Sequence, residues 1–202
     1  METITISTKN SKLGQMIPTI NLPPILTCRE NAPCRKGCYA CKGNFVYTTV
    51  QKSMQKNLRI YKDNAENYFN QIQGYLLGLP YKCFRYHSAG DIVDTKYLQL
   101  MCETARKCKK TQFLCFTKKY ELVNNYIKTR HKIPKNLVIV FSAWANFIPD
   151  NPYNLPMTYV NFSKDGIDKN IPKKAKKCKG DCATCQMCWK LKNGQSVYFN
   201  KH

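Results

Sequence analysis

The chain has 202 residues, of which 43% are apolar, so one globular domain with an internal core fits its length and composition. It carries 33 lysines and arginines against 12 acidic residues, a formal net charge of +21. No stretch approaches 18 consecutive apolar residues, and the N-terminal sequence METITISTKN lacks the pattern of a signal peptide. We therefore expect neither a secreted nor a membrane-spanning protein, but a cytoplasmic one.

The excess of positive charge predicts a polyanionic partner, with a nucleic acid or a nucleotide as the first candidate. Lysines and arginines that contact phosphates release condensed counterions, which makes such binding favourable without any base recognition. The alternative is a lysine-rich surface that is only solvated. The sequence contains no compact nucleic-acid recognition motif that would decide between the two.

The N-terminal region begins with residues 3–7, which alternate like a short strand. Pro18, Pro23 and Pro24 then forbid a regular helix. The chain next enters a first cysteine segment, residues 28–41, with the sequence CRENAPCRKGCYAC. In a reducing compartment, cysteines that cluster in this way are metal ligands more often than disulfide partners.

The first cysteine segment has the spacing of an iron–sulfur site. Cys34, Cys38 and Cys41 have three and then two residues between them, as in radical S-adenosylmethionine enzymes. There, three thiolates hold a [4Fe–4S] cluster and leave one iron free for S-adenosylmethionine. Cys28 supplies a further thiol, so Cys28, Cys34 and Cys38 form an alternative triad. A zinc knuckle is a second alternative, and a disulfide framework is a weaker one.

The middle of the chain alternates between strand and helix patterns. This alternation predicts an α/β fold, either a partial (β/α) barrel of about six mostly parallel strands with a cysteine-rich C-terminal extension or an open sheet. We expect residues 1–170 to form the partial barrel with its cysteine loop, and residues 171–202 to form a second metal-site segment with the last strand. The expected helices are 49–77, as one or two helices, 95–108 and 119–130, and the expected strands are 81–86, 112–116, 137–141, 157–162 and 196–199.

Polar residues follow several of the predicted strands. In parallel α/β folds, ligands bind at the carboxyl ends of the strands. Ser88, Gly90 and Asp91 follow the first of the central strands, and Ser142 follows a later one. We expect these four residues to position the cosubstrate, with Asp91 accepting hydrogen bonds from an ammonium or a ribose hydroxyl. The alternative is that Ser-Ala-Gly-Asp is only a turn that leads into a helix.

A basic stretch leads to a second cysteine segment. Residues 164–177 contain six lysines, which predicts an exposed linker or a phosphate-binding loop. Cys178, Cys182, Cys185 and Cys188 follow with gaps of three, two and two residues. Four thiols so close together favour one closed centre, either an auxiliary [4Fe–4S] cluster or, alternatively, structural zinc. The remaining cysteines are expected to be small buried residues; they are Cys83, Cys102, Cys108 and Cys115.

Several motifs, taken together, resemble the bacteriophage gene product eighty-eight family along nearly the whole chain. They are KLGQMIPTINLPPILTC, CRKGCYA, VQKSMQKNLR, FRYHSAGDIVDTKYL, FLCFTKK, CATCQMCWK and VYFNKH. The resemblance implies that Cys28, Cys34 and Cys38 are ligands, because in that family the position of Cys41 need not be cysteine. The family looks like a compact relative of radical S-adenosylmethionine proteins. A phage protein of this kind is expected in the host-cell cytoplasm.

The sequence thus predicts a radical S-adenosylmethionine enzyme. We expect it to generate a 5′-deoxyadenosyl radical and to modify a nucleotide or nucleic acid, with electrons from a donor such as a flavodoxin or ferredoxin. The alternative is a basic protein without enzymatic activity, in which zinc or iron–sulfur sites stiffen a nucleic-acid-binding surface.

Overall fold

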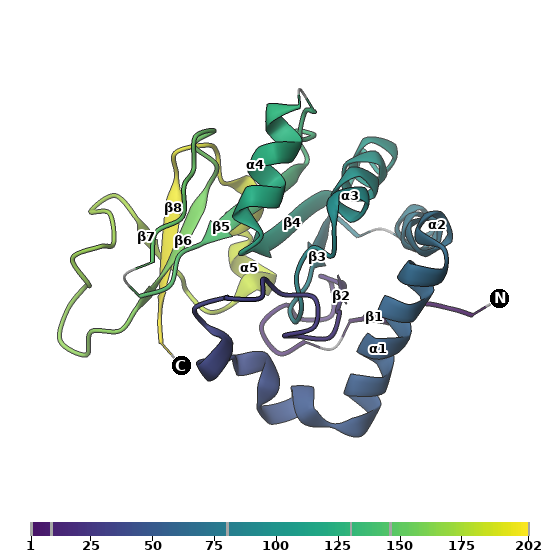
Figure 1. Ribbon diagram of the computed structural model, residues 1–202, viewed down its shortest axis with the longest axis horizontal. Coiled ribbons are helices and arrows are strands. Elements are labelled where there is room, and N and C mark those ends of the chain that lie inside the picture. The colour runs from purple at the N-terminus through teal and green to yellow at the C-terminus, as the bar shows by residue number, and fades with distance from the viewer. Residues whose placement is uncertain (1, 9, 80, 130, 146, 202) are drawn as a thin grey trace.

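The computed structural model describes residues 2–8, 10–79, 81–129, 131–145 and 147–201. In this part of the chain, eight strands form one sheet in the order β1-β2-β3-β4-β5-β6-β8-β7 (Figure 1). The strands are β1 (Ile6–Ser7), β2 (Thr19–Ile20), β3 (Cys83–Tyr86), β4 (Gln112–Thr117), β5 (Leu137–Ser142), β6 (Met157–Asn161), β7 (Lys176–Lys177) and β8 (Ser196–Asn200). The α-helices are α1 (Thr48–Asp63), α2 (Ala65–Leu77), α3 (Thr95–Lys107), α4 (Tyr120–Lys128) and α5 (Cys182–Cys185).

The sheet is mostly parallel and open. Strands β1 and β2 pair antiparallel, and each of the other neighbouring pairs is parallel. Strands β1 and β7 form the two edges and do not pair with each other within the described residues. The predicted α/β class is therefore confirmed. The sheet is the open alternative, so the expected partial barrel of about six strands is corrected to an open sheet of eight.

Side-chain caps begin α2 and α3. The long helix predicted over residues 49–77 is divided at Asn64, whose side chain accepts a hydrogen bond from the Asn67 amide at 2.8 Å and so begins α2. Asp94 begins α3 in the same way, by accepting from the Tyr97 amide at 2.8 Å. Helix α4 falls within the predicted range 119–130, whose last residue, Arg130, lies outside the described residues. Among the described helices, none combines the length and the apolar character needed to span a bilayer.

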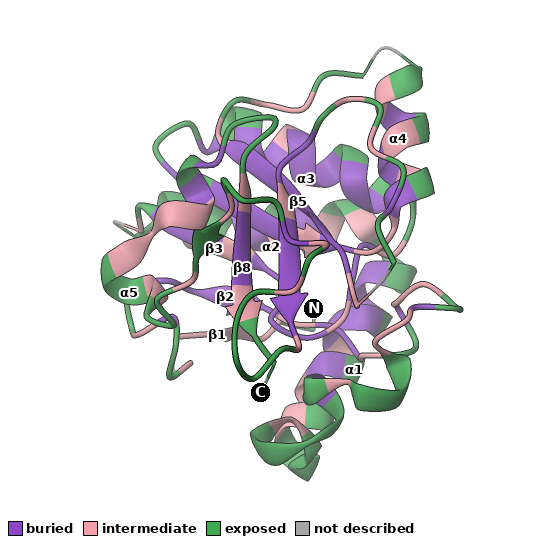
Figure 2. Ribbon diagram, turned by 90° about the vertical axis from the view of Figure 1, so that its left-hand side faces the viewer, coloured by how far each residue is buried: buried purple, intermediate pink, exposed green. Residues whose placement is uncertain are grey.

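The two faces of the sheet are covered by different parts of the chain. Alternate residues of β3, β4 and β5 point to opposite faces, because side chains in a strand have a period of two. On one face Phe84 and Phe113 pack against α1 to α4. On the other face Leu114 and Val140 pack against the N-terminal segment and Trp189, which follows the second cysteine segment. Figure 2 shows the buried central strands between these layers.

The C-terminal residues are built into the same sheet. Strand β8, predicted as the last strand, pairs with β6 over five residue pairs. The Trp189 indole donates a hydrogen bond to the backbone carbonyl of Phe84 in β3 at 3.0 Å. The second cysteine segment therefore lies against the central strands.

Gly90 allows two segments to meet after β3. Its φ of +87° lies in the region that favours glycine. A Cβ atom here would lie 2.7 Å from the Leu22 carbonyl oxygen and 2.9 Å from the Thr27 hydroxyl oxygen. The sequence predicted that Gly90 helps to position a cosubstrate. In the structure, the close neighbours are the residues that lead into the first cysteine segment.

We predict that Gly90→Ala lowers the free energy of unfolding by about 3 kcal/mol, because backbone strain and steric overlap add together. The matched control is Gly180→Ala, at a similar φ of +81° with no heavy atom within 4 Å of the added Cβ. We expect the free energy of unfolding of the control to fall by about 1 kcal/mol, because of backbone strain alone. Urea denaturation of both variants measures the difference. Equal losses would show that the contact with Leu22 and Thr27 is unimportant.

Candidate metal centres at the sheet

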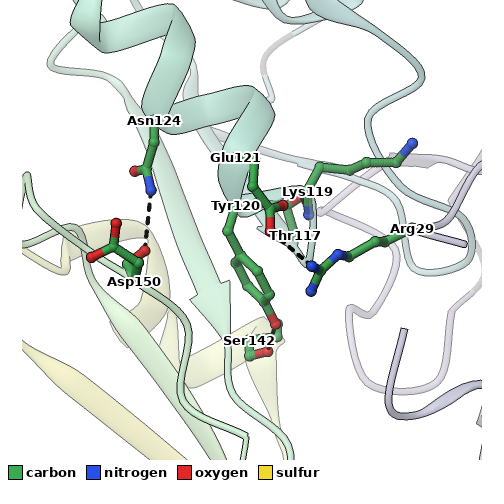
Figure 3. Close-up of polar contacts among 8 residues, drawn as sticks. All are labelled: Arg29, Thr117, Lys119, Tyr120, Glu121, Asn124, Ser142 and Asp150. Atoms are coloured by element: carbon green, nitrogen blue, oxygen red, sulfur yellow. Dashed lines mark hydrogen bonds and ion pairs between the residues drawn. The ribbon is translucent and has the colours of Figure 1, made fainter. Parts of the chain in front are cut away.

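The predicted cosubstrate-binding residues lie at the carboxyl edge of the central strands. Ser88, Gly90 and Asp91 follow β3, and Ser142 is the last residue of β5. The side chains of Ser88, Asp91 and Ser142 are all buried. Ser142 offers its backbone carbonyl to the hydroxyl of Tyr120, which begins α4 (Figure 3). The structure thus gathers the predicted residues at one edge, beneath the surface.

The Asp91 carboxylate is bonded within the chain. It accepts hydrogen bonds from the Thr117 hydroxyl at 2.6 Å, from the Lys118 amide at 2.9 Å and from the Ile92 amide at 2.8 Å. The Asp91 amide donates to the Thr27 hydroxyl at 3.0 Å. Burial raises the pKa of Asp91, and the hydrogen bonds act in the opposite direction. Asp91 joins the end of β3 to the end of β4 through its carboxylate, and to the residue before Cys28 through its amide.

Tyr39 attaches the first cysteine segment to the same edge. Its hydroxyl donates to the backbone carbonyl of Ser88 at 2.5 Å. The residue as a whole is 58% exposed, but the hydroxyl end is enclosed, and this burial raises its pKa. Sequence reasoning treated Tyr39 only as a departure from the usual motif. Its position between Cys38 and Cys41 is visible in the sequence. Its hydrogen-bond partner could not be predicted, because the Ser88 carbonyl is 49 residues away.

Arg29 attaches the segment to α4. Its guanidinium donates to the Glu121 carboxylate at 2.8 Å (Figure 3). It also lies 5.8 Å from the ring centre of Tyr120 and 5.6 Å from that of Phe147. Because the Glu121 side chain is 64% exposed, the ion pair itself stabilises the segment only weakly. The two aromatic contacts give the guanidinium its fixed position.

The first cysteine segment places its thiols at different depths. Cys28, Cys34 and Cys38 are half-buried, whereas Cys41 is exposed. Burial raises the pKa of Cys28 to about 11, with further contributions from the Asp91 carboxylate and from the Cys38 and Cys34 thiols. Burial also raises the pKa of Cys38, which shares a hydrogen bond with Cys41. Cys28, Cys34 and Cys38 are therefore electrostatic neighbours on the inner side of the segment.

The second cysteine segment folds around backbone bonds. The Cys178 amide donates to the carbonyl of Tyr198 in β8 at 2.7 Å, and the Cys182 amide donates to the Lys12 carbonyl at 2.9 Å. Asp181 caps the short helix α5 through the amides of residues 183 and 184. Burial raises the pKa of Cys188 to about 12, and the Cys178 and Cys182 thiols raise it further. These contacts bring the cysteines together on the second face of the sheet.

Arg85 of β3 places positive charge beside the second segment. Its charge opposes the effect of burial on the pKa of both Cys182 and Cys188. The guanidinium carbon lies 5.1 Å from the ring centre of Phe116, and its Nε atom is buried without a hydrogen-bond partner in the part of the chain that the structure describes. A cation in this position favours thiolates over thiols. Sequence reasoning missed Arg85, because a single arginine within a strand has no distinguishing pattern.

The donor sets of both segments suit metal binding, although the side chains are not arranged around a single ion. Among the described residues, no three histidine, cysteine or acidic side chains stand where they share one ion position. The chemistry of the donors nevertheless fits an iron–sulfur cluster, since each segment supplies at least three thiols. The cationic Arg85 and the amide of Gly180, which donates to the Cys178 sulfur at 3.4 Å, also favour bound thiolates. Metal binding is thus a proposal that rests on the donor set.

His87 is part of the core. It is buried, and its Nε2 atom lies 2.9 Å from the Tyr97 hydroxyl. Burial lowers its pKa from 6.5 to about 3, and Arg85 adds to this effect. Its φ of +62° is unusual for a residue other than glycine. The other cysteines are also core residues, and their predicted burial is confirmed for Cys83, Cys102, Cys108 and Cys115.

Fold and site together define an open α/β protein with two cysteine segments, one at the carboxyl edge of the sheet and one on its second face. The family model described as gene product 88 matches residues 2–191. The chain therefore belongs to the gene product 88 family, a phage gene product family, as its motifs predicted. No curated protein and no solved structure matches it.

We predict that Tyr39→Phe loosens the first cysteine segment. The variant loses one hydrogen bond, which typically costs about 1 kcal/mol. Amides of residues 28–41 should then exchange with deuterium about five times faster, as 1 kcal/mol implies. The control is Tyr47→Phe, because Tyr47 is 60% exposed and its hydroxyl has no hydrogen-bond partner among the described residues. Unchanged exchange in the Tyr39 variant would mean that the bond to Ser88 does not hold the segment.

We also predict that His87 makes stability fall with acidity. A folded pKa of about 3 against 6.5 means that its contribution is fully present above pH 6.5 and is lost as the pH falls toward 3. Between pH 7 and pH 5 this linkage amounts to about 2 kcal/mol.

Urea denaturation at the two pH values measures this loss in the wild type and in His87→Asn. Asparagine tolerates the positive φ and does not titrate, so the variant should show a pH dependence smaller by about 2 kcal/mol. The prediction is wrong if wild type and variant lose the same amount of stability.

Proposed function

We propose that this chain is an iron–sulfur protein that cleaves S-adenosylmethionine reductively and acts on a nucleotide or nucleic acid. The observation that carries the proposal is the attachment of the first cysteine segment to the carboxyl edge of the parallel sheet, through Tyr39 and Thr27. Ligands of open parallel sheets bind at this edge. A three-thiol segment held there is what a cluster with a free iron requires.

The inner thiols are the best candidates for the first cluster. Cys34 and Cys38 belong to both possible triads, and half-buried Cys28 completes the set better than exposed Cys41. When bound, such a cluster passes an electron to S-adenosylmethionine, whose cleavage gives methionine and a 5′-deoxyadenosyl radical. The electron comes from a separate donor, such as a flavodoxin or ferredoxin. The part of this chain is to hold the thiols at the edge of the sheet.

The buried residues at this edge serve as positioning residues. The Asp91 carboxylate is bonded to Thr117 and Lys118, and the Ser88 carbonyl accepts the Tyr39 hydroxyl. We propose that Ser88, Gly90, Asp91 and Ser142 orient the cosubstrate through the segment that they support. Direct contact between these side chains and the cosubstrate is not needed.

The second cysteine segment would hold an auxiliary [4Fe–4S] cluster, with zinc as the alternative. Cys178, Cys182, Cys185 and Cys188 provide four thiols, which close the coordination of one metal centre. Because the segment packs against β3 and β4, bound metal there would stabilise the fold.

A second candidate function is a basic nucleic-acid-binding protein without enzymatic activity. Two observations favour it: the formal charge of +21 and the internal bonding of the Asp91 carboxylate. Both metal sites would then be closed, structural centres.

The test is electron paramagnetic resonance of the anaerobically reconstituted, reduced protein with and without S-adenosylmethionine. We expect a four-iron signal that changes when the cosubstrate is added. Cys28→Ser should abolish this change, because serine is a poor ligand for iron. Cys41→Ser is the matched control and should retain it, since Cys41 is exposed.

Two results would contradict the leading proposal. In the first, the wild-type iron signal does not respond to S-adenosylmethionine, which means that both clusters are closed. In the second, metal analysis finds zinc in place of iron. If Cys41→Ser loses the response and Cys28→Ser retains it, the enzymatic proposal stands, but Cys34, Cys38 and Cys41 are the cluster ligands.

A further inference from the structure

A groove of about 990 Å³ lies at the amino ends of β3 and β4, the end of the sheet opposite to the first cysteine segment. It runs between the end of α2, the turn before β4 and the second cysteine segment. One wall is formed by Gln186 of the second cysteine segment together with Trp189 and Lys190, which follow that segment. None of these residues has a role in the function proposed above.

The groove has an apolar floor and a basic rim. Buried residues form the floor, among them Leu76, Cys108 and Trp189. Two exposed leucines, Leu77 and Leu79, stand at the side formed by the end of α2. The rim carries five exposed lysines: Lys82, Lys107, Lys109, Lys110 and Lys190.

These lysines are not neutralised by the protein. No acidic side chain of the described residues lines the groove. Within the described ranges, none of the five forms an ion pair with a carboxylate. Five like charges around one concavity repel one another, so an anionic partner that neutralises them binds favourably.

We propose that this groove binds a single-stranded nucleic acid. The lysines contact successive phosphates, and the apolar floor receives unstacked bases. The bases of a duplex are stacked inside the helix and cannot contact an apolar floor. The surface of a bilayer is too flat to enter a groove. The inference rests on the nucleic-acid partner in the proposed function, but not on S-adenosylmethionine chemistry.

The first test compares two pairs of lysines in the reconstituted protein. Lys109→Gln with Lys110→Gln removes two charges from the groove rim. Lys52→Gln with Lys62→Gln is the matched control, because these two lysines of α1 are equally exposed but lie outside both the groove and the basic stretch 164–177. Binding of a fluorescein-labelled single-stranded oligothymidylate is followed by fluorescence anisotropy at several salt concentrations.

We expect the groove variant to bind about tenfold more weakly and to lower the salt slope by about 1.4, since each phosphate contact to a single strand contributes about 0.7. The control should change affinity less than about threefold, because it alters only the overall charge. Equal losses in both variants overturn the proposal. It is also overturned if the groove variant loses binding to phosphatidylglycerol vesicles and keeps its affinity for the oligonucleotide.

The second test uses the wild-type protein and does not depend on a variant's folding. Lysines are acetylated with and without the oligothymidylate and are then quantified by mass spectrometry. Lys109, Lys110 and Lys190 should be protected, whereas Lys52 and Lys62 should not. Absence of this protection shows that the groove does not bind the nucleic acid. If the electron paramagnetic resonance signal still responds to S-adenosylmethionine, the proposed enzymatic function is unaffected.

Discussion

The structure depends on a buried carboxylate at the carboxyl edge of the sheet. An ionised carboxyl group in the core is costly unless several donors surround it. Asp91 satisfies this requirement with donors from the end of β4, and its own amide holds Thr27, whose hydroxyl bonds to the Pro23 carbonyl at 2.8 Å. The path of the chain into Cys28 is thereby fixed to the two central strands. Without this constraint, a loop with three prolines and little regular structure would have no defined position above the sheet.

The two faces of the sheet are buried by different kinds of structure. Helices α1 to α4 cover one face with large aromatic side chains. The other face is covered by largely irregular chain. Here Trp189, Leu13 and the partly buried cysteines of the second segment take the place of a helix layer. Irregular segments have few internal hydrogen bonds, so they need an additional source of order. In the proposed function, thiolates bound to one metal centre would provide it, because metal binding would be coupled to folding of such a segment.

The sequence predicted the elements that have strong local patterns. Residues 137–141 are apolar and mostly β-branched, and β5 is buried throughout. Strands β2 and β7 have two residues each, which is too short for any periodicity to be recognised. The serine, glycine and aspartate after β3 were correctly placed at the carboxyl edge. Their bonds could not be predicted, because the partners of Asp91 lie 26 and 64 residues away in the sequence.

The distance between the two ends of the sheet bears on the kind of substrate. The first cysteine segment lies at the carboxyl ends of the strands, and the lysine groove lies at their amino ends. Strand β4 has six residues, so the two ends are about 20 Å apart along it. An unstacked single strand is more extended than a strand of a stacked duplex, so a few successive phosphates of it span this length. A mononucleotide cannot occupy both ends at once, whereas a polymer can. If both proposed sites bind one partner, that partner is a nucleic-acid chain rather than a free nucleotide.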